Sequence, residues 1–413
     1  MASPYRAIFA ARGSGWFSAA GLLGRLPMSM TSVGIVAMVS QLTGRYALAG
    51  ALSATVGLAT ALFSPQISRL VDRHGQRRVL PPAMLVAVAS VTGLVLCART
   101  GAPEWSLFLF AVTCGCTPSV GSMVRSRWVA LYRDRRKLLQ SAFAFEAVLD
   151  ECCFVIGPIL AIGLSTAWFP EAGPLLAGSC LLAGVLWLTA QHGTEPVPAP
   201  RGPHTGGSAL RTPGLQVLVG VFVFTGAIFG SIDVVTIAFA EERGRQGAAS
   251  LLLAGYALGS ALAGVGFGLI RFTSPAAPRW LWGIWAMAVS LLPLQLVESL
   301  PALAGTLFLA GFTIAPTMVT TMVLVEQLVP AEALTEGMTW TGTGITVGMA
   351  LGSSTAGWAV DTFGADRAYA VPLTAGALAT AVAFLGYRRL RPGSTGGTVI
   401  HERTTGDEPT SVA

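Results

Sequence analysis

The chain has 413 residues, of which 53% are hydrophobic and only 11% are charged, and its formal net charge is +6. A soluble protein of this length has roughly a quarter of its residues charged. The composition therefore argues against a soluble enzyme or a nucleic-acid-binding protein. It indicates a polytopic protein whose main surroundings are the lipid bilayer.

The sequence contains twelve largely apolar segments, each about long enough to cross a bilayer core as a helix. In chain order they lie near residues 16–42, 47–67, 79–98, 104–126, 139–164, 169–191, 214–239, 248–270, 279–298, 301–325, 337–360 and 367–387. We therefore predict an all-α membrane protein with twelve transmembrane helices.

The distribution of Arg and Lys predicts the orientation of these helices. With both termini in the cytoplasm, 20 of the 26 basic residues fall in cytoplasmic segments, 5 in outer segments, and Arg25 within the first span. Positive charge near the ends of spans stays on the cytoplasmic side. One Lys, no Asn and abundant Ala and Gly are typical of a GC-rich bacterial genome. We therefore expect a bacterial inner (plasma) membrane protein with cytoplasmic termini.

The longest connection is rich in Pro, Gly and Thr, and it divides the spans into two sets of six. The polar tail after the last span has the composition of a disordered segment. The predicted domains are an N-terminal six-helix bundle (1–191), a cytoplasmic linker (192–213), a C-terminal six-helix bundle (214–392) and a disordered cytoplasmic tail (393–413).

The short loop after the second span is the densest charged run, Ser68-Arg-Leu-Val-Asp-Arg-His-Gly-Gln-Arg-Arg-Val-Leu80. It resembles the signature loop of the major facilitator superfamily, Gly-x-Leu-Ala-Asp-Arg-x-Gly-Arg-Lys-x-x-Leu. Ser68 replaces the first Gly, and Gln76 replaces a basic residue. The matching positions are Leu70, Asp72, Arg73, Gly75, Arg77 and Leu80.

This resemblance implies two pseudo-symmetric six-helix bundles and secondary transport by alternating access. It also implies a gate in which Asp72 pairs with Arg125 or Arg127, at the inner end of the fourth span. Asp72 would then face the start of the eleventh span near 335–338, where the helix dipole favours a carboxylate. The alternative is that these basic residues only anchor the loop on the cytoplasmic side.

Three carboxylates, Glu146, Asp150 and Glu151, lie in the fifth span. An ionised carboxylate at the bilayer centre costs at least about 2.5 kcal/mol, so such residues face a cavity or a partner. Glu146 and Asp150 share one helix face, and Arg25 lies at a similar depth in the first span. We predict that Arg25 pairs with one of these acids. The pair is either a structural lock between spans or a proton-coupling site.

Two further features of the spans favour proton-coupled transport. Gly157-Pro158 resembles the Gly-Pro motif of drug/proton antiporters of the superfamily, in which Pro kinks the helix. Asp233 in the seventh span is a second candidate proton-coupling residue, or else a solvated helix end near Glu241 and Glu242. No His lies inside a span, which leaves carboxylates as the groups that can carry a proton at depth.

The central cavity is predicted to be apolar with a few hydroxyl groups, which suits varied apolar ligands. The chain lacks Asn, and its Gln residues lie at span ends or in loops, which argues against a sugar porter. We expect a monomeric exporter of small amphipathic or apolar compounds, driven by protons, with no cofactor, metal site or enzyme activity. The alternatives are a uniporter, a proton symporter importing a metabolite, or a non-transporting sensor or scaffold. The candidate cavity residues are Met28, Met30, Phe222, Phe229, Thr313, Thr317, Met318 and Thr321.

Overall fold

The computed structural model describes residues 4–198, 208–245, 248–270, 272 and 274–390. All regular secondary structure within these residues is helical, as the sequence predicts. The tail 393–413 and residues 199–207 of the linker lie outside the described residues. So do four basic residues that contributed to the predicted orientation, Arg201, Arg271, Arg391 and Arg403.

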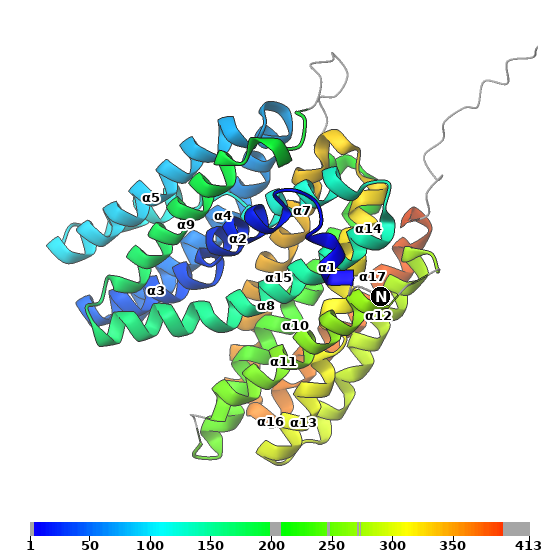
Figure 1. Cartoon of the computed structure of the whole chain (residues 1–413). Helices are drawn as coiled ribbons and strands as arrows, with labels where there is room; N and C mark the ends of the chain where they lie inside the picture. The colour runs from blue at the N-terminus through cyan, green and yellow to red at the C-terminus, as the bar shows by residue number, and fades with distance from the viewer. Residues whose placement is uncertain (1–3, 199–207, 246–247, 271, 273, 391–413) are drawn as a thin grey trace, which may run out of the picture.

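The N-terminal half contains the first six spans (Figure 1). A short helix, α1 (Pro4–Ile8), precedes them. The first span is built from two consecutive helices, and the fourth is also divided. The helices are α2 (Ser14–Arg25), α3 (Pro27–Thr43), α4 (Tyr46–His74), α5 (Gln76–Thr100), α6 (Glu104–Cys114), α7 (Val120–Tyr132), α8 (Arg136–Ala167) and α9 (Ala172–Ala190).

The C-terminal half contains the other six spans. Between the halves lie two 3-10 turns, His192–Thr194 and Ala209–Arg211, and further turns are Leu292–Leu296, Ala331–Ala333 and Tyr387–Leu390. The helices are α10 (Pro213–Glu242), α11 (Ala248–Leu269), α12 (Ala276–Ser290), α13 (Leu300–Gly311), α14 (Ile314–Leu328), α15 (Leu334–Phe363), α16 (Ala365–Ala368) and α17 (Ala370–Gly386).

Nine helical stretches of the described chain are long and apolar enough to cross a membrane. The other three predicted spans correspond to α6 with α7, α12 with its following turn, and α15. The first two are interrupted, and α15 is rich in Gly and Thr, which lowers its hydropathy.

The fourth and tenth spans are broken in corresponding places. The fourth is interrupted between Cys114 and Val120. Pro118 lies in this interruption, and it has no backbone N–H to donate a helical hydrogen bond. A Cβ at Gly115 would lie 2.4 Å from the Ala59 methyl group of α4. The tenth span breaks after Gly311, where a Cβ would lie 2.2 Å from the Tyr256 carbonyl oxygen of α11. This repetition supports the two-fold pseudo-symmetry, which the sequence shows only faintly.

Helices α10 and α15 pack through glycines on both of their facing sides. A Cβ on Gly348 would lie 1.9 Å from the Val223 carbonyl oxygen, and one on Gly226 would lie 2.1 Å from the Ile345 carbonyl oxygen. The glycine face predicted on the eleventh span, which also includes Gly344 and Gly352, is therefore a close helix contact.

The two halves form two groups of helices that meet near α7, α14 and α15 (Figure 1). Hydrogen bonds join the halves along two helix pairs, α4 with α15 and α8 with α11. Beyond Glu151, α8 becomes exposed. Phe154 is 46% exposed and Ile156 47% exposed.

Candidate functional site

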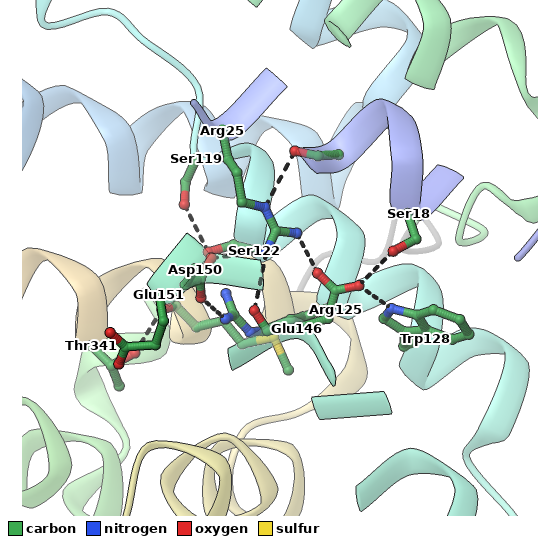
Figure 2. A network of polar contacts seen from close by, with 12 residues as sticks. Ser18, Arg25, Ser119, Ser122, Arg125, Trp128, Glu146, Asp150, Glu151 and Thr341 are labelled. Atoms are coloured by element: carbon green, nitrogen blue, oxygen red, sulfur yellow. Dashed lines mark hydrogen bonds and ion pairs between the residues drawn. The ribbon is translucent and has the colours of Figure 1, made fainter. Parts of the chain in front are cut away.

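A buried charge network connects α2, α7 and α8 in the N-terminal half (Figure 2). Arg25 forms an ion pair with Glu146, and its other terminal nitrogen donates to Asp150 Oδ1 at 2.8 Å. Its Nε donates to the Gly21 carbonyl oxygen at 3.2 Å. The predicted pairing of Arg25 with the acids of the fifth span is confirmed, and it includes both acids. The network therefore ties the first span to the fifth.

Glu146 is fully buried and has two further donors. Its Oε1 accepts from Trp128 Nε1 at 2.7 Å and from Ser18 Oγ at 3.1 Å, while Oε2 contacts Arg25 (Figure 2). Both oxygens of this carboxylate are thus held by donors. Sequence reasoning missed Ser18 and Trp128, because nothing in the local pattern marks them as partners of a residue far along the chain.

Arg125 lies in this network and not in the predicted gate. Its guanidinium forms an ion pair with Asp150, whose carboxylate is therefore shared between Arg125 and Arg25. The prediction that Arg125 closes the fourth span was wrong, because α7 continues to Tyr132. Seven residues of helix place Arg125 roughly 10 Å inside that end. Two guanidinium groups and two carboxylates then give a network without net charge.

Glu151 points away from this network toward the other half of the protein. Its Oε1 accepts a hydrogen bond from Ser260 Oγ of α11 at 2.7 Å. No ion pair joins Glu151 to a basic residue within the described part of the chain. The sequence identified Glu151 as a buried acid but gave no sign of its partner Ser260.

Asp233 is half-buried within α10, nine residues before that helix ends at Glu242. It is not a solvated helix end, so the structural alternative for this residue was wrong. It lies close enough to Tyr256 of α11 for an electrostatic interaction, and Tyr256 also interacts with Glu151. The described residues provide no ion-pair partner for Asp233.

Asp72 lies at the contact between α4 and α15, as the signature loop predicts. Its carboxylate accepts from the backbone N–H of Glu336 at 2.8 Å and of Thr335 at 3.3 Å. These are N–H groups in the first turn of α15, where a negative charge is favoured by the helix dipole. Ser68 lies one turn before Asp72 on α4, and its hydroxyl group is 2.8 Å from that of Thr339 on α15.

The predicted pairing of Asp72 with Arg125 or Arg127 is not present among the described ion pairs. Arg127 is fully buried, and its Nε donates to Gln76 Oε1 at 2.7 Å. Gln76 Nε2 in turn donates to the Met123 carbonyl oxygen at 3.0 Å. The substitution of Gln76 for a basic residue explains this arrangement, because an amide can accept from Arg127 where a second cation would repel it.

The described ends of the linker contact both halves of the protein, next to the contact between Asp72 and α15. Arg127 donates to Thr194 Oγ1 at 2.8 Å, and Glu195 accepts from the Arg77 backbone N–H at 2.9 Å. At the other end, the Ser208 hydroxyl donates to the Glu336 carboxylate. The linker is thus bound to α5 in one half and to α15 in the other.

The exposed side chains of the signature loop surround a cavity of about 510 Å³ next to the linker. Gly75 makes the turn between α4 and α5 with a φ of 88°, which an L side chain rarely adopts. The cavity is lined by Arg73, His74, Arg77, Arg78, His192, Glu195, Pro196, Val197 and Pro198.

Gly157 and Pro158 lie within α8, which continues through them to Ala167. A Cβ at Gly157 would lie 2.0 Å from Ser29 Oγ of α3, so this glycine permits a close contact between the first and fifth spans. Ser29 Oγ also donates to the Cys153 carbonyl oxygen at 2.7 Å. The predicted kink stays a prediction.

Half of the predicted cavity residues are packed inside the helix bundles. Thr321 of α14 accepts a hydrogen bond from Trp280 Nε1 of α12 at 2.8 Å. Thr317 of α14 faces Gly283 of α12. The prediction that these side chains are accessible to a ligand was wrong for this conformation, because they hold neighbouring helices together. The buried residues are Met30, Phe222, Thr317 and Thr321. Met28 is 53% exposed, and Phe229, Thr313 and Met318 are partly exposed.

The family model of the Major Facilitator Superfamily matches residues 17–280 and 218–406. The chain belongs to the major facilitator superfamily. It is therefore a membrane transporter, and its helices form the twelve-span, two-bundle fold of that family. No curated protein sequence matches the chain.

Two solved structures illustrate the fold. The human organic anion transporter MFSD10 (TETRAN) is 15% identical with a TM-score of 0.67, and the match covers 92% of this chain and 99% of that one. A bacterial homologue of the iron transporter ferroportin in an outward-facing state is 14% identical with a TM-score of 0.72. That match covers 92% of this chain and 100% of the homologue. At these identities the likeness concerns the fold.

Proposed function

We propose that this transporter exports small amphipathic or apolar compounds in exchange for protons, by alternating access. The observation that carries the proposal is the contact between Asp72 and the first turn of α15. It joins the two halves through a few polar bonds at one membrane face. Such bonds can be exchanged for water when the halves separate.

The positive-inside distribution of basic residues supports a cytoplasmic position for this contact and for both termini. The structure then corresponds to a conformation closed on the cytoplasmic side of a bacterial inner membrane. In a transport cycle, Asp72 would leave α15 as the cytoplasmic side opens.

Carboxylates at depth support coupling to protons. Glu146, Asp150 and Glu151 occupy two adjacent turns of α8, and no His of this chain lies within a span. The chain has no Asn. This favours apolar or amphipathic ligands over sugars, whose hydroxyl groups need many amide partners.

Dye transport in inverted membrane vesicles tests this function. When the vesicle lumen is acidic, we expect vesicles that contain the protein to accumulate a fluorescent amphipathic dye. A protonophore should abolish this accumulation. Asp72→Asn provides a control protein that inserts in the membrane but has weaker bonds between Asp72 and α15. Equilibration without accumulation would favour a uniporter, and proton-driven movement in the opposite direction would favour an importer. Absence of movement for every probe would favour a sensor or scaffold.

A further inference from the structure

Glu151 differs from the two other acids of α8 in its electrostatic surroundings. Glu146 and Asp150 are held by Arg25 and Arg125, so protonating either acid would leave a buried cation without its partner. Glu151 has a hydroxyl donor and, within the described residues, no cation. A carboxylate that is partly removed from water and lacks a cation is readily relieved of its charge by protonation.

The groups described around Glu151 are neutral or acidic, and they include Thr341 of α15 (Figure 2). Ser260 and Tyr256 lie one turn apart on α11, and both are buried. Asp150 precedes Glu151 on α8, but its charge is matched by the two arginines. Asp233 of α10 interacts with Tyr256 on the far side. Nothing in this set offers a positive charge to hold Glu151 ionised.

The bond between Glu151 and Ser260 crosses between the two halves, because α8 belongs to the first and α11 to the second. It also lies where the contact between the halves ends. Residues 141–144 of α8 are buried, whereas Phe154, Val155 and Ile156 are all exposed. Consecutive helical residues are about 100° apart, so three in a row expose more than one face of α8. Glu151 itself is partly exposed, at the end of this contact between the halves.

We infer that Glu151 takes up and releases the transported proton, and that its hydrogen bond with Ser260 links this step to the arrangement of the two halves. The inference rests on the proposed proton-coupled export and names the coupling residue. In the conformation seen here, the carboxylate takes a proton from water on the outer side. After the halves move and the bond to Ser260 is broken, the carboxylic acid releases that proton to cytoplasmic water. One proton moves inward in each cycle, and the network around Arg25 stays paired.

Glu151→Gln is the first test, in inverted vesicles with an acidic lumen. We expect proton-driven dye accumulation to fall at least tenfold, while exchange of dye for dye stays within twofold of the wild type. Glu151→Asp restores the carboxylate and should recover part of the accumulation. Size-exclusion and thermal-unfolding profiles should match the wild type, because an amide can still accept from Ser260. Normal proton-driven accumulation by Glu151→Gln would overturn the inference.

A matched pair of serines tests the role of the hydrogen bond. Ser260→Ala should shift the midpoint of the pH profile of transport while exchange continues. Ser141 donates to the Gly268 carbonyl oxygen at 3.0 Å on the same pair of helices, but without an ionisable partner. Ser141→Ala should leave the pH profile unchanged. Equal pH shifts in both variants would show that loss of a contact between α8 and α11 is the cause, and would refute the specific link to Glu151.

The proposed function and this inference fail in different ways. If the wild type shows no response to a pH gradient, proton coupling itself is wrong. If the wild type responds and Glu151→Gln responds equally, then coupling exists but resides elsewhere. Loss of coupling in Glu146→Gln or Asp150→Asn, together with a normal Glu151→Gln, would assign it to the network around Arg25.

Discussion

Removal of Arg25 from the buried network should destabilise the protein strongly, and a second substitution should recover much of the loss. The network holds two guanidinium groups and two carboxylates. Arg25→Met leaves one cation facing two acids. Breaking a buried ion pair in this way costs about 3–5 kcal/mol, because one charge is left without compensation.

The choice of second substitution is decided by the geometry. Arg25→Met with Glu146→Gln leaves Arg125 and Asp150, which contact each other directly, so the remaining charges are neutral and paired. Arg25→Met with Asp150→Asn leaves Arg125 and Glu146, between which no ion pair is described. We therefore expect the first combination to be the more stable, with a coupling energy of about 0.5–3 kcal/mol between Arg25 and Glu146.

The measurement is a double-mutant cycle on purified protein in detergent. Thermal or denaturant unfolding can be followed by tryptophan fluorescence, and Trp128, which donates to Glu146, provides a local reporter. Arg45→Met serves as a control, because Arg45 pairs with Glu104 on the exposed surface and should contribute little. Strictly additive losses for Arg25→Met and Glu146→Gln would refute the reasoning. Equal recovery in both double variants would also contradict it.

Three further predictions concern the gate and the helix contacts. Asp72→Asn should reduce transport at least tenfold with normal membrane insertion, because it weakens the charge-assisted bonds to the first turn of α15; wild-type transport at wild-type expression would exclude the gate. Gly348→Ala should lower expression and the thermal midpoint, because its Cβ would lie 1.9 Å from a carbonyl oxygen, whereas Gly357→Ala has open space and should be neutral. Gln76→Ala should cost about 1–3 kcal/mol, because it leaves the Arg127 Nε unsatisfied. An unchanged unfolding midpoint would argue against that role.

The membrane fold could be predicted because each bilayer span needs a long apolar helix, a requirement that operates locally in the sequence. The pairing of Arg25 with the acids of α8 could be predicted for a related reason, since charged residues deep in spans are rare and must find each other. The position of Arg125 could not be predicted. Its charge suggested the end of a span, but α7 continues to Tyr132. Its partner Asp150 comes from another part of the chain, so the local sequence does not reveal the pair.

The predicted cavity residues show a second limit of sequence reasoning. Thr317, Thr321 and Phe222 have the chemistry expected of a substrate site, but each faces a neighbouring helix of its own half. Which side of a membrane helix faces the centre depends on its rotation. In an evenly apolar helix such as α10, the sequence contains little information about that rotation. Glu151 shows the converse, since its chemistry was visible but its partner on α11 was not.

The two halves hold equivalent helices together by different physical means, and this difference explains where the ion chemistry lies. In the C-terminal half, the seventh and eleventh spans meet through Gly226, Gly230, Gly348 and Gly352, with backbone against backbone. In the N-terminal half, the first and fifth spans are tied by Arg25 and the acids of α8. Glycine contacts leave no room for a side chain and do not respond to protons. The same helix α8 carries Glu151, which is bonded to Ser260 of α11, so the response to pH should start in the N-terminal half and reach the other through α8 and α11.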